Sequence, residues 1–195
     1  YLPAMEPEWF YDSLVYHLAV PEQWLIRHKV CHLPHTFFSN FPFLEEMQFA
    51  IFLGLGDDLA PKVLHWAHGS LATIATYALA RTVLGPVSSL LAACVFLSQP
   101  TLRFLQHVTM VELGMTWFQV LAALAFARAM GWAEGERRRP HAWLAAAGWV
   151  LGFAQGTKYI GIWASGLILG WWWLAHLRDG RPIRRAATGS GWLIA

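Results

Sequence analysis

The stretch LGFAQGTKYIGIWASGLILG, residues 151–170, places a single lysine, Lys158, inside otherwise uncharged and mostly apolar sequence. It lies within an apolar run from 141 to 177, which at about 37 residues is long enough for two membrane helices of about 20 residues each. The Gly-Thr-Lys break at 156–158 then predicts a tight turn between two antiparallel helices. This pattern of long apolar segments joined by short polar breaks decides the fold.

The composition extends this interpretation to the whole chain. Hydrophobic residues make up 56% of the 195 residues and charged residues only 13%, which is too apolar for an ordinary soluble domain. Many of the 12 tryptophans lie near the ends of apolar segments, as is typical of membrane interfaces. The formal charge of +2 is spread over short clusters, so nucleic-acid binding is not indicated.

Five apolar segments predict an all-α fold, a polytopic α-helical membrane protein. The predicted spans are 59–80, 87–102, 112–132, 141–157 and 159–177, with a sixth beginning near 186. The chain has no initiating methionine and ends a few residues into that sixth apolar segment. We therefore expect it to be a segment of a longer protein.

Residues 1–58 differ in kind from residues 59–195, the predicted transmembrane bundle. They are rich in proline, acids and histidine, which predicts a large first extramembrane loop. We expect one short helix at about 12–28 and a second at 43–56. The second is too short to cross a bilayer and is typical of an interfacial helix.

The distribution of basic residues predicts the orientation. Nine of the 14 Lys/Arg residues fall on one side if the five spans alternate, and this side is predicted to be cytoplasmic. They are Arg81, Arg128, Arg137, Arg138, Arg139, Arg178, Arg181, Arg184 and Arg185. Residues 1–58 and the turn at Lys158 then lie on the extracytoplasmic side, together with nine of the 12 acidic residues.

Lys158 has two interpretations. A lysine at the end of a membrane helix can extend its ammonium group to the interface and do no more. The flanking Gly156 and Gly161 favour a second interpretation, because glycine lets the backbone break or approach another group closely. Free amide N–H groups beside an ammonium group would suit a phosphate.

Three further residues on the extracytoplasmic side each have two interpretations. Asp12, among aromatic neighbours, is either the N-cap of a helix or a catalytic carboxylate. Glu112 is either an acid in the first turn of a helix or a second carboxylate facing Asp12. Arg103 binds either a phosphate or a carboxylate of the loop.

The histidines indicate packing rather than metal chemistry. The spacing of His28, Cys31, His32 and His35 matches no strong zinc motif, and Pro34 interrupts any helix there. His65 and His68 lie three residues apart on one predicted helix. For them, hydrogen bonds at the interface or between helices are favoured over ligation of a pigment or haem.

Several motifs in order carry a resemblance to a known family. They are YDSLVYHLAVPEQWL, LPHTFFSNFPFLEEMQF, DDLAPKVLHWAHGSLATIATYALAR, VELGMTWFQVLAALAFAR and LGFAQGTKYIGI. The chain resembles bacterial multi-pass membrane glycosyltransferases of the C-type fold, the group related to protein O-mannosyltransferases and aminoarabinose transferases. The frequent Asp-Glu doublet of that group reads Asp12-Ser13 here, which argues against protein mannosylation and leaves the use of a metal open.

The resemblance implies a mechanism and a set of site residues. Asp12 would be the base that deprotonates the acceptor, which attacks a sugar carried on a polyprenyl phosphate with inversion. Lys158 would bind the leaving phosphate with Gly156, Tyr159 and Arg103. Glu112 would orient the acceptor or share a divalent cation with Asp12.

The resemblance also implies the partners and the location. These are the lipid bilayer and the polyprenyl-phosphate sugar donor in the bacterial cytoplasmic (inner) membrane, with no nucleic acid. One alternative is a non-catalytic subunit that keeps the fold and packs against other membrane subunits. A transporter is disfavoured, because almost every ionisable group lies at one face or the other.

Overall fold

The computed structural model describes residues 3–56, 58–132, 140–178, 191 and 193, and every regular element among them is helical. This confirms the all-α class. The α-helices are α1 (Ala19–Ile26), α2 (Leu44–Gly54), α3 (Leu59–Ala80), α4 (Pro86–Leu97), α5 (Pro100–Leu105), α6 (Glu112–Ala129), α7 (Pro140–Thr157) and α8 (Ile162–Arg178). Short helical turns lie at Pro3–Met5, Ser13–His17, Phe37–Asn40 and Tyr159–Gly161.

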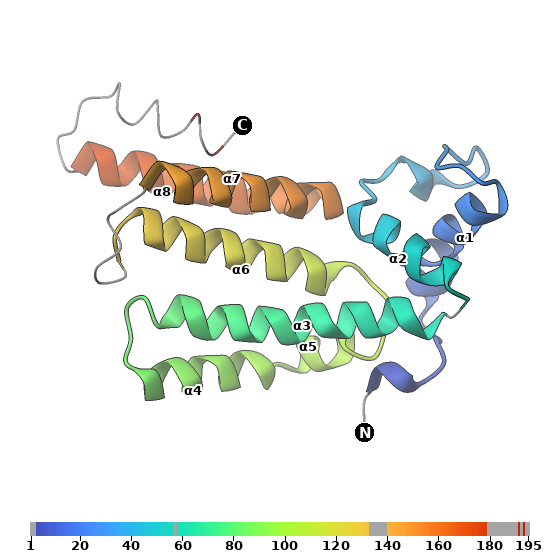
Figure 1. Cartoon of the computed structure of the whole chain (residues 1–195), viewed down its shortest axis with the longest axis horizontal. Coiled ribbons are helices and arrows are strands. Elements are labelled where there is room, and N and C mark those ends of the chain that lie inside the picture. Colours follow the sequence, from blue (N-terminus) through green and yellow to red (C-terminus); the bar gives the residue numbers. More distant parts are fainter. Residues whose placement is uncertain (1–2, 57, 133–139, 179–190, 192, 194–195) are drawn as a thin grey trace.

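The long helices form an antiparallel bundle (Figure 1). Helix α6 packs against α3 on one side and α7 on the other, α4 covers the outer side of α3, and α8 lies beside α7. Residues 3–56 gather at the end of the bundle where α3 begins and α7 ends. The first segment of the chain therefore covers the end that contains the turn at Lys158.

Small residues make the close helix contacts in the bundle. Ala72 on α3, Ala122 on α6 and Ala147 and Ala154 on α7 are fully buried. Small side chains let helix backbones approach closely, which is how helices associate where the hydrophobic effect is weak. The first segment has a hydrophobic cluster of its own, formed by Tyr16, Val20, Trp24 and Leu33.

The predicted span at 87–102 is wrong as one continuous helix. Helix α4 ends at Leu97, and a separate short helix, α5, begins at Pro100. Proline disfavours the helical conformation in the residue before it, and Gln99 is indeed extended. The predicted helix at 12–28 is also divided, into a π-helical turn at Ser13–His17 and α1.

Length and hydropathy single out one described helix, Tyr159–Arg178, as a candidate membrane span, with Pro86–Ser98 as a shorter apolar helix. Five crossings therefore remain a prediction, and the sixth predicted segment falls mostly outside the described residues. The apolar side chains of α8 are largely exposed, and those of Trp163 and Leu167 are more than 70% exposed. An outer helix with such a face is typical of contact with lipid.

Candidate functional site

The turn between α7 and α8 depends on a glycine at position 161. A Cβ atom on Gly161 would lie 2.6 Å from the carbonyl oxygen of Ala154, so no other residue fits without moving the backbone. The prediction of a close backbone approach is confirmed here. Gly156, by contrast, belongs to the last turn of α7 and contacts Leu44 of α2.

The backbone of this turn bonds largely to itself. The N–H of Lys158 donates to the carbonyl of Ala154 at 3.2 Å, and the N–H of Gly161 donates to the carbonyl of Lys158 at 2.9 Å. Neither amide is therefore available to a phosphate. The cationic side chain of Lys158 remains as the group that could bind an anion.

That side chain points to a carboxylate. Nζ of Lys158 lies 2.5 Å from Oε1 of Glu112, the first residue of α6. The two side chains are 39% and 24% exposed, so the pair is partly open to its surroundings. Glu112 is thus an acid in the first turn of a helix and also the partner of Lys158, and the ammonium group does not simply extend to the interface.

Tyr159 joins the turn to the first segment of the chain. Its hydroxyl donates to the carbonyl of Asn40 at 3.0 Å, and its ring meets the ring of Phe41 edge to face. The loop around Phe37–Asn40 is therefore held against the end of α7. This contact closes one side of a small cavity.

The cavity has a volume of about 200 Å³ and opens beside Lys158. Its polar lining side chains include His17, Glu46 and Lys158, and its walls are mainly aromatic and aliphatic. The lining residues are Tyr16, His17, Phe41, Pro42, Glu46, Val111, Thr157, Lys158, Tyr159 and Ile160. A small, mostly apolar cavity with a few convergent polar groups is typical of a ligand site.

Two buried histidine–glutamate pairs lie at or near this cavity. Nδ1 of His17 lies 2.7 Å from Oε1 of Glu46, and Nδ1 of His68 lies 2.7 Å from Oε1 of Glu45. Burial raises the pKa of both glutamates, against the opposing effect of the histidines. The pairs tie α2 to the turn at Ser13–His17 on one side and to α3 on the other.

The Glu45 carboxylate reaches its place because position 114 is a glycine. A Cβ atom there would overlap the Glu45 side chain, so Gly114 of α6 lets the carboxylate pack directly on the helix backbone. Helix α2 is thereby fixed on both α3 and α6. Its neighbouring residue Glu46 is then presented to the cavity.

Asp12 precedes the π-helical turn and is half-buried. It has helical backbone angles and makes no capping hydrogen bond through its side chain, so the interpretation as an N-cap is wrong. Asp12 does not line the small cavity, but its charge affects the pKa of Tyr16, which does. Burial, followed by the charges of Asp12, Glu112 and Glu46, raises the pKa of Tyr16.

Arg103 is not brought to the cavity. It lies in the last turn of α5, with its side chain exposed, and it is absent from the lining. Among the described residues, no group of three or more His, Cys, Asp or Glu side chains could hold a metal ion. Glu112 bonds Lys158, so a cation shared with Asp12 would have to compete with this ion pair.

The histidines of α3 form the predicted interhelical hydrogen bonds. His65 bonds the carbonyl of Val108 through Nδ1 at 2.8 Å, and its Nε2 accepts from the N–H of Leu113 at 3.2 Å. His65 is fully buried, and both of its ring nitrogens are used. It therefore holds the start of α6, and with it Glu112, against α3.

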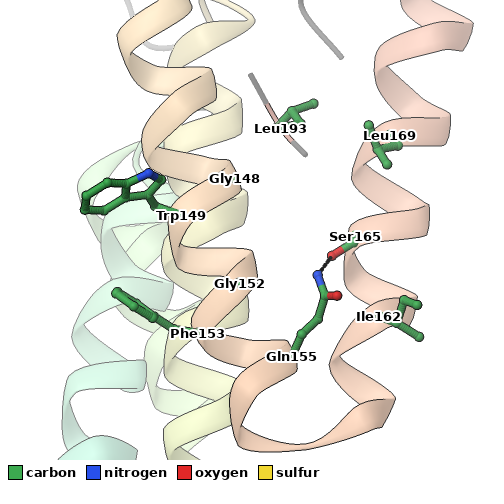
Figure 2. A pocket seen from close by; sticks show the side chains of 9 residues that line it. All are labelled: Gly148, Trp149, Gly152, Phe153, Gln155, Ile162, Ser165, Leu169 and Leu193. Carbon is green, nitrogen blue, oxygen red and sulfur yellow. Dashed lines mark hydrogen bonds between the residues drawn. The ribbon is translucent and has the colours of Figure 1, made fainter. Parts of the chain in front are cut away.

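A second, larger cavity of about 710 Å³ lies between α7 and α8 (Figure 2). Its walls come from the faces of the two helices on either side of the turn and from Leu193. Inside it, the amide of Gln155 donates to the hydroxyl of Ser165 at 2.8 Å. Gly148 and Gly152 leave space on the α7 wall.

The sequence analysis did not identify Tyr16, His17 and Glu46 as residues that line the small cavity. The signal available was the Glu45-Glu46 doublet, two adjacent acids at the start of an otherwise apolar segment. Buried acids need partners. The identity of the partners could not be read from the sequence, because His17 lies 29 positions away from Glu46.

A comparison with known protein families gave a match. A family model described as dolichyl-phosphate-mannose-protein mannosyltransferase matches residues 39–194, which includes Glu112 and the turn at Lys158. Neither a curated protein nor a solved structure matched the chain.

Proposed function

The chain belongs to the family of dolichyl-phosphate-mannose-protein mannosyltransferases, and we propose from this premise that it moves a sugar to an acceptor at the extracytoplasmic face of a bacterial cytoplasmic membrane. Members of the family are membrane glycosyltransferases whose sugar donor is a polyprenyl phosphate. The observation that carries the proposal is the cavity beside Lys158, where the turn between α7 and α8 meets the first segment.

Lys158 would bind the phosphate of the donor. An ammonium group has three N–H donors, and Glu112 uses one of them, so the others can reach phosphate oxygens. Glu112 would hold the ammonium group in place. As the bond between sugar and phosphate breaks, Lys158 would then stabilise the negative charge of the leaving phosphate.

Asp12 would be the base. It would take the proton from an acceptor hydroxyl or amine, which attacks the anomeric carbon from the face opposite the phosphate and inverts its configuration. A phosphate leaves without needing a proton, so one base is sufficient. Besides burial, the charges of Asp12, Glu112 and Glu46 raise the pKa of Tyr16. This shared effect supports a common location for the three carboxylates.

The larger cavity would take the start of the polyprenyl chain. It lies between α7 and α8, and its lining includes Gln155 and Ile162, on either side of the turn at Lys158. If the lipid phosphate is bound at Lys158, the first isoprene units of its chain would lie beside this cavity. These two cavities favour an enzyme over the non-catalytic subunit, which needs neither.

The experiment is transfer of labelled sugar from a polyprenyl-phosphate donor by the purified protein in liposomes. Asp12→Asn should abolish transfer and leave the thermal unfolding temperature unchanged, because Asp12 makes no side-chain capping bond. Glu22→Gln, at an exposed carboxylate of α1, is the control and should keep full activity. Transfer by the Asp12→Asn protein at the wild-type rate would refute the role of the base.

A further inference from the structure

His17 lines the small cavity and has one ring nitrogen without a hydrogen-bond partner in the part of the chain that the structure describes. The residue is 1% exposed and lines the cavity, and its Nδ1 is bonded to Glu46. Its Nε2 is buried and has no hydrogen-bond partner among the described residues. Most buried polar side-chain atoms have a partner, so an unsatisfied one beside a cavity indicates a ligand.

The bond to Glu46 narrows the chemistry of that ligand. When the Glu46 carboxylate accepts from Nδ1, the ring proton lies there and Nε2 is left as an acceptor. When Glu46 is protonated and donates to Nδ1, the single ring proton of the neutral imidazole lies on Nε2, which then donates. A hydroxyl group fits both states, since it can donate or accept.

The location of His17 indicates which hydroxyl it meets. Lys158 lines the same cavity, and the proposed function has its ammonium group on the donor phosphate. The sugar is bonded directly to that phosphate, so its ring must lie next to Lys158. The walls from Tyr16 and Phe41 offer apolar faces to the C–H groups of a sugar ring.

We propose that His17 binds a hydroxyl of the donor sugar through Nε2, with Glu46 as the positioning residue that fixes the ring. This inference rests on the proposed function and assigns the sugar end of the donor. A site built to bond a hydroxyl rejects analogues that lack it, because its own polar group is then left unpaired. His17 is therefore a specificity-determining residue.

The chain supplies a matched control. His68 is buried to a similar degree and bonds Glu45 at the same 2.7 Å, but it does not line the cavity. Loss of either histidine removes the histidine partner of a buried glutamate. Only the loss of His17 should change how the protein recognises a sugar.

The test is binding of polyprenyl-phosphate mannose, glucose and galactose, and of their monodeoxy analogues, by calorimetry. The parent protein carries Asp12→Asn, so that no donor is consumed. For the best-bound sugar, removal of one hydroxyl should weaken binding roughly 10- to 100-fold. In His17→Leu this penalty should disappear, while in His68→Leu it should remain.

The same penalty in His17→Leu as in the parent would overturn the inference. His17→Gln, whose amide can also bond a hydroxyl, should keep part of the penalty, and it answers the question if the leucine variant does not fold. Failure of the parent to bind any of the three donors is a different result. It would overturn the proposed function, and with it the assignment of His17.

Discussion

Lys158 and Glu112 form an ion pair with Nζ 2.5 Å from Oε1, although the residues lie 46 positions apart. The pair joins the turn after α7 to the first residue of α6, beside the cavity that the first segment closes. Its partial exposure matters, because a charge pair open to its surroundings can exchange one partner for a ligand.

Lys158→Met should weaken binding of the polyprenyl-phosphate donor about tenfold or more, because the cation opposite the phosphate is lost. Its cost in stability should be about 1 kcal/mol or less, since both side chains are partly exposed. Calorimetry and thermal unfolding measure the two effects.

Lys158→Arg is the control, because it keeps a positive charge and should retain most of the affinity. Unchanged affinity in Lys158→Met would return the residue to a role as an interfacial anchor. Glu112→Gln should keep the ammonium group of Lys158 but hold it in place less firmly. We therefore expect a smaller loss of donor affinity than for Lys158→Met.

Gly152→Leu should fill the cavity between α7 and α8. A Cβ atom at Gly152 meets nothing within 4 Å, so the added side chain extends into open space rather than into the core. We expect weaker binding of donors with long prenyl chains and little change for a donor with one or two isoprene units. Equal weakening of both classes would contradict the placement of the chain in this cavity.

Gly114→Ala should destabilise the fold by about 1–3 kcal/mol, because the new Cβ atom overlaps the buried Glu45 carboxylate. Gly166→Ala on α8 is the matched control, since its Cβ atom meets nothing within 4 Å. That control should leave stability unchanged or raise it through helix propensity. Thermal unfolding of the purified proteins in detergent compares them, and equal stability of the two variants would contradict the packing of Glu45.

Glu8 should make the attachment of the first segment sensitive to acid. Its Oε2 accepts from the N–H of Thr109 at 2.6 Å, and its Oε1 accepts from the N–H groups of Trp9 and Phe10. Burial alone would raise the pKa of Glu8, but hydrogen bonding to the side chain of Thr109 and to the N–H groups of Phe10, Trp9 and Thr109 outweighs it and lowers the pKa below its ordinary value of 4.5. The stability that Glu8 contributes is therefore fully present at pH values above 4.5.

That contribution should be lost as the pH falls through the lowered pKa of Glu8. Glu8→Gln should reduce the unfolding temperature near pH 7 and make its decline in acid less steep. Glu22→Gln, at an exposed carboxylate, should follow the wild-type curve. Parallel pH profiles for wild type and Glu8→Gln would contradict the lowered pKa of Glu8 in the folded protein.

Local patterns predicted the helices well and their interruptions less well. The turn at Lys158 was predicted from glycines and one charge in an apolar run, and the structure has α7 end at Thr157. The polar stretch SQPTLRFLQHVT, residues 98–109, predicted a link, but the predicted span at 87–102 ran past Pro100, where the backbone restriction that proline imposes divides α4 from α5. An N-cap was one of the two interpretations of Asp12, and its side chain makes no such bond.

By itself, the sequence determined the all-α class, the order of the apolar helices and the presence of a cation at a glycine-flanked turn, because hydrophobicity and turn chemistry act over a few neighbouring residues. Only the tertiary structure decided which charges meet. The pairing of Lys158 with Glu112 and of His17 with Glu46 depends on how α2, α6 and α7 pack, and on the missing side chain at Gly114 that lets Glu45 reach its place. Contacts between residues tens of positions apart leave no mark in a local pattern.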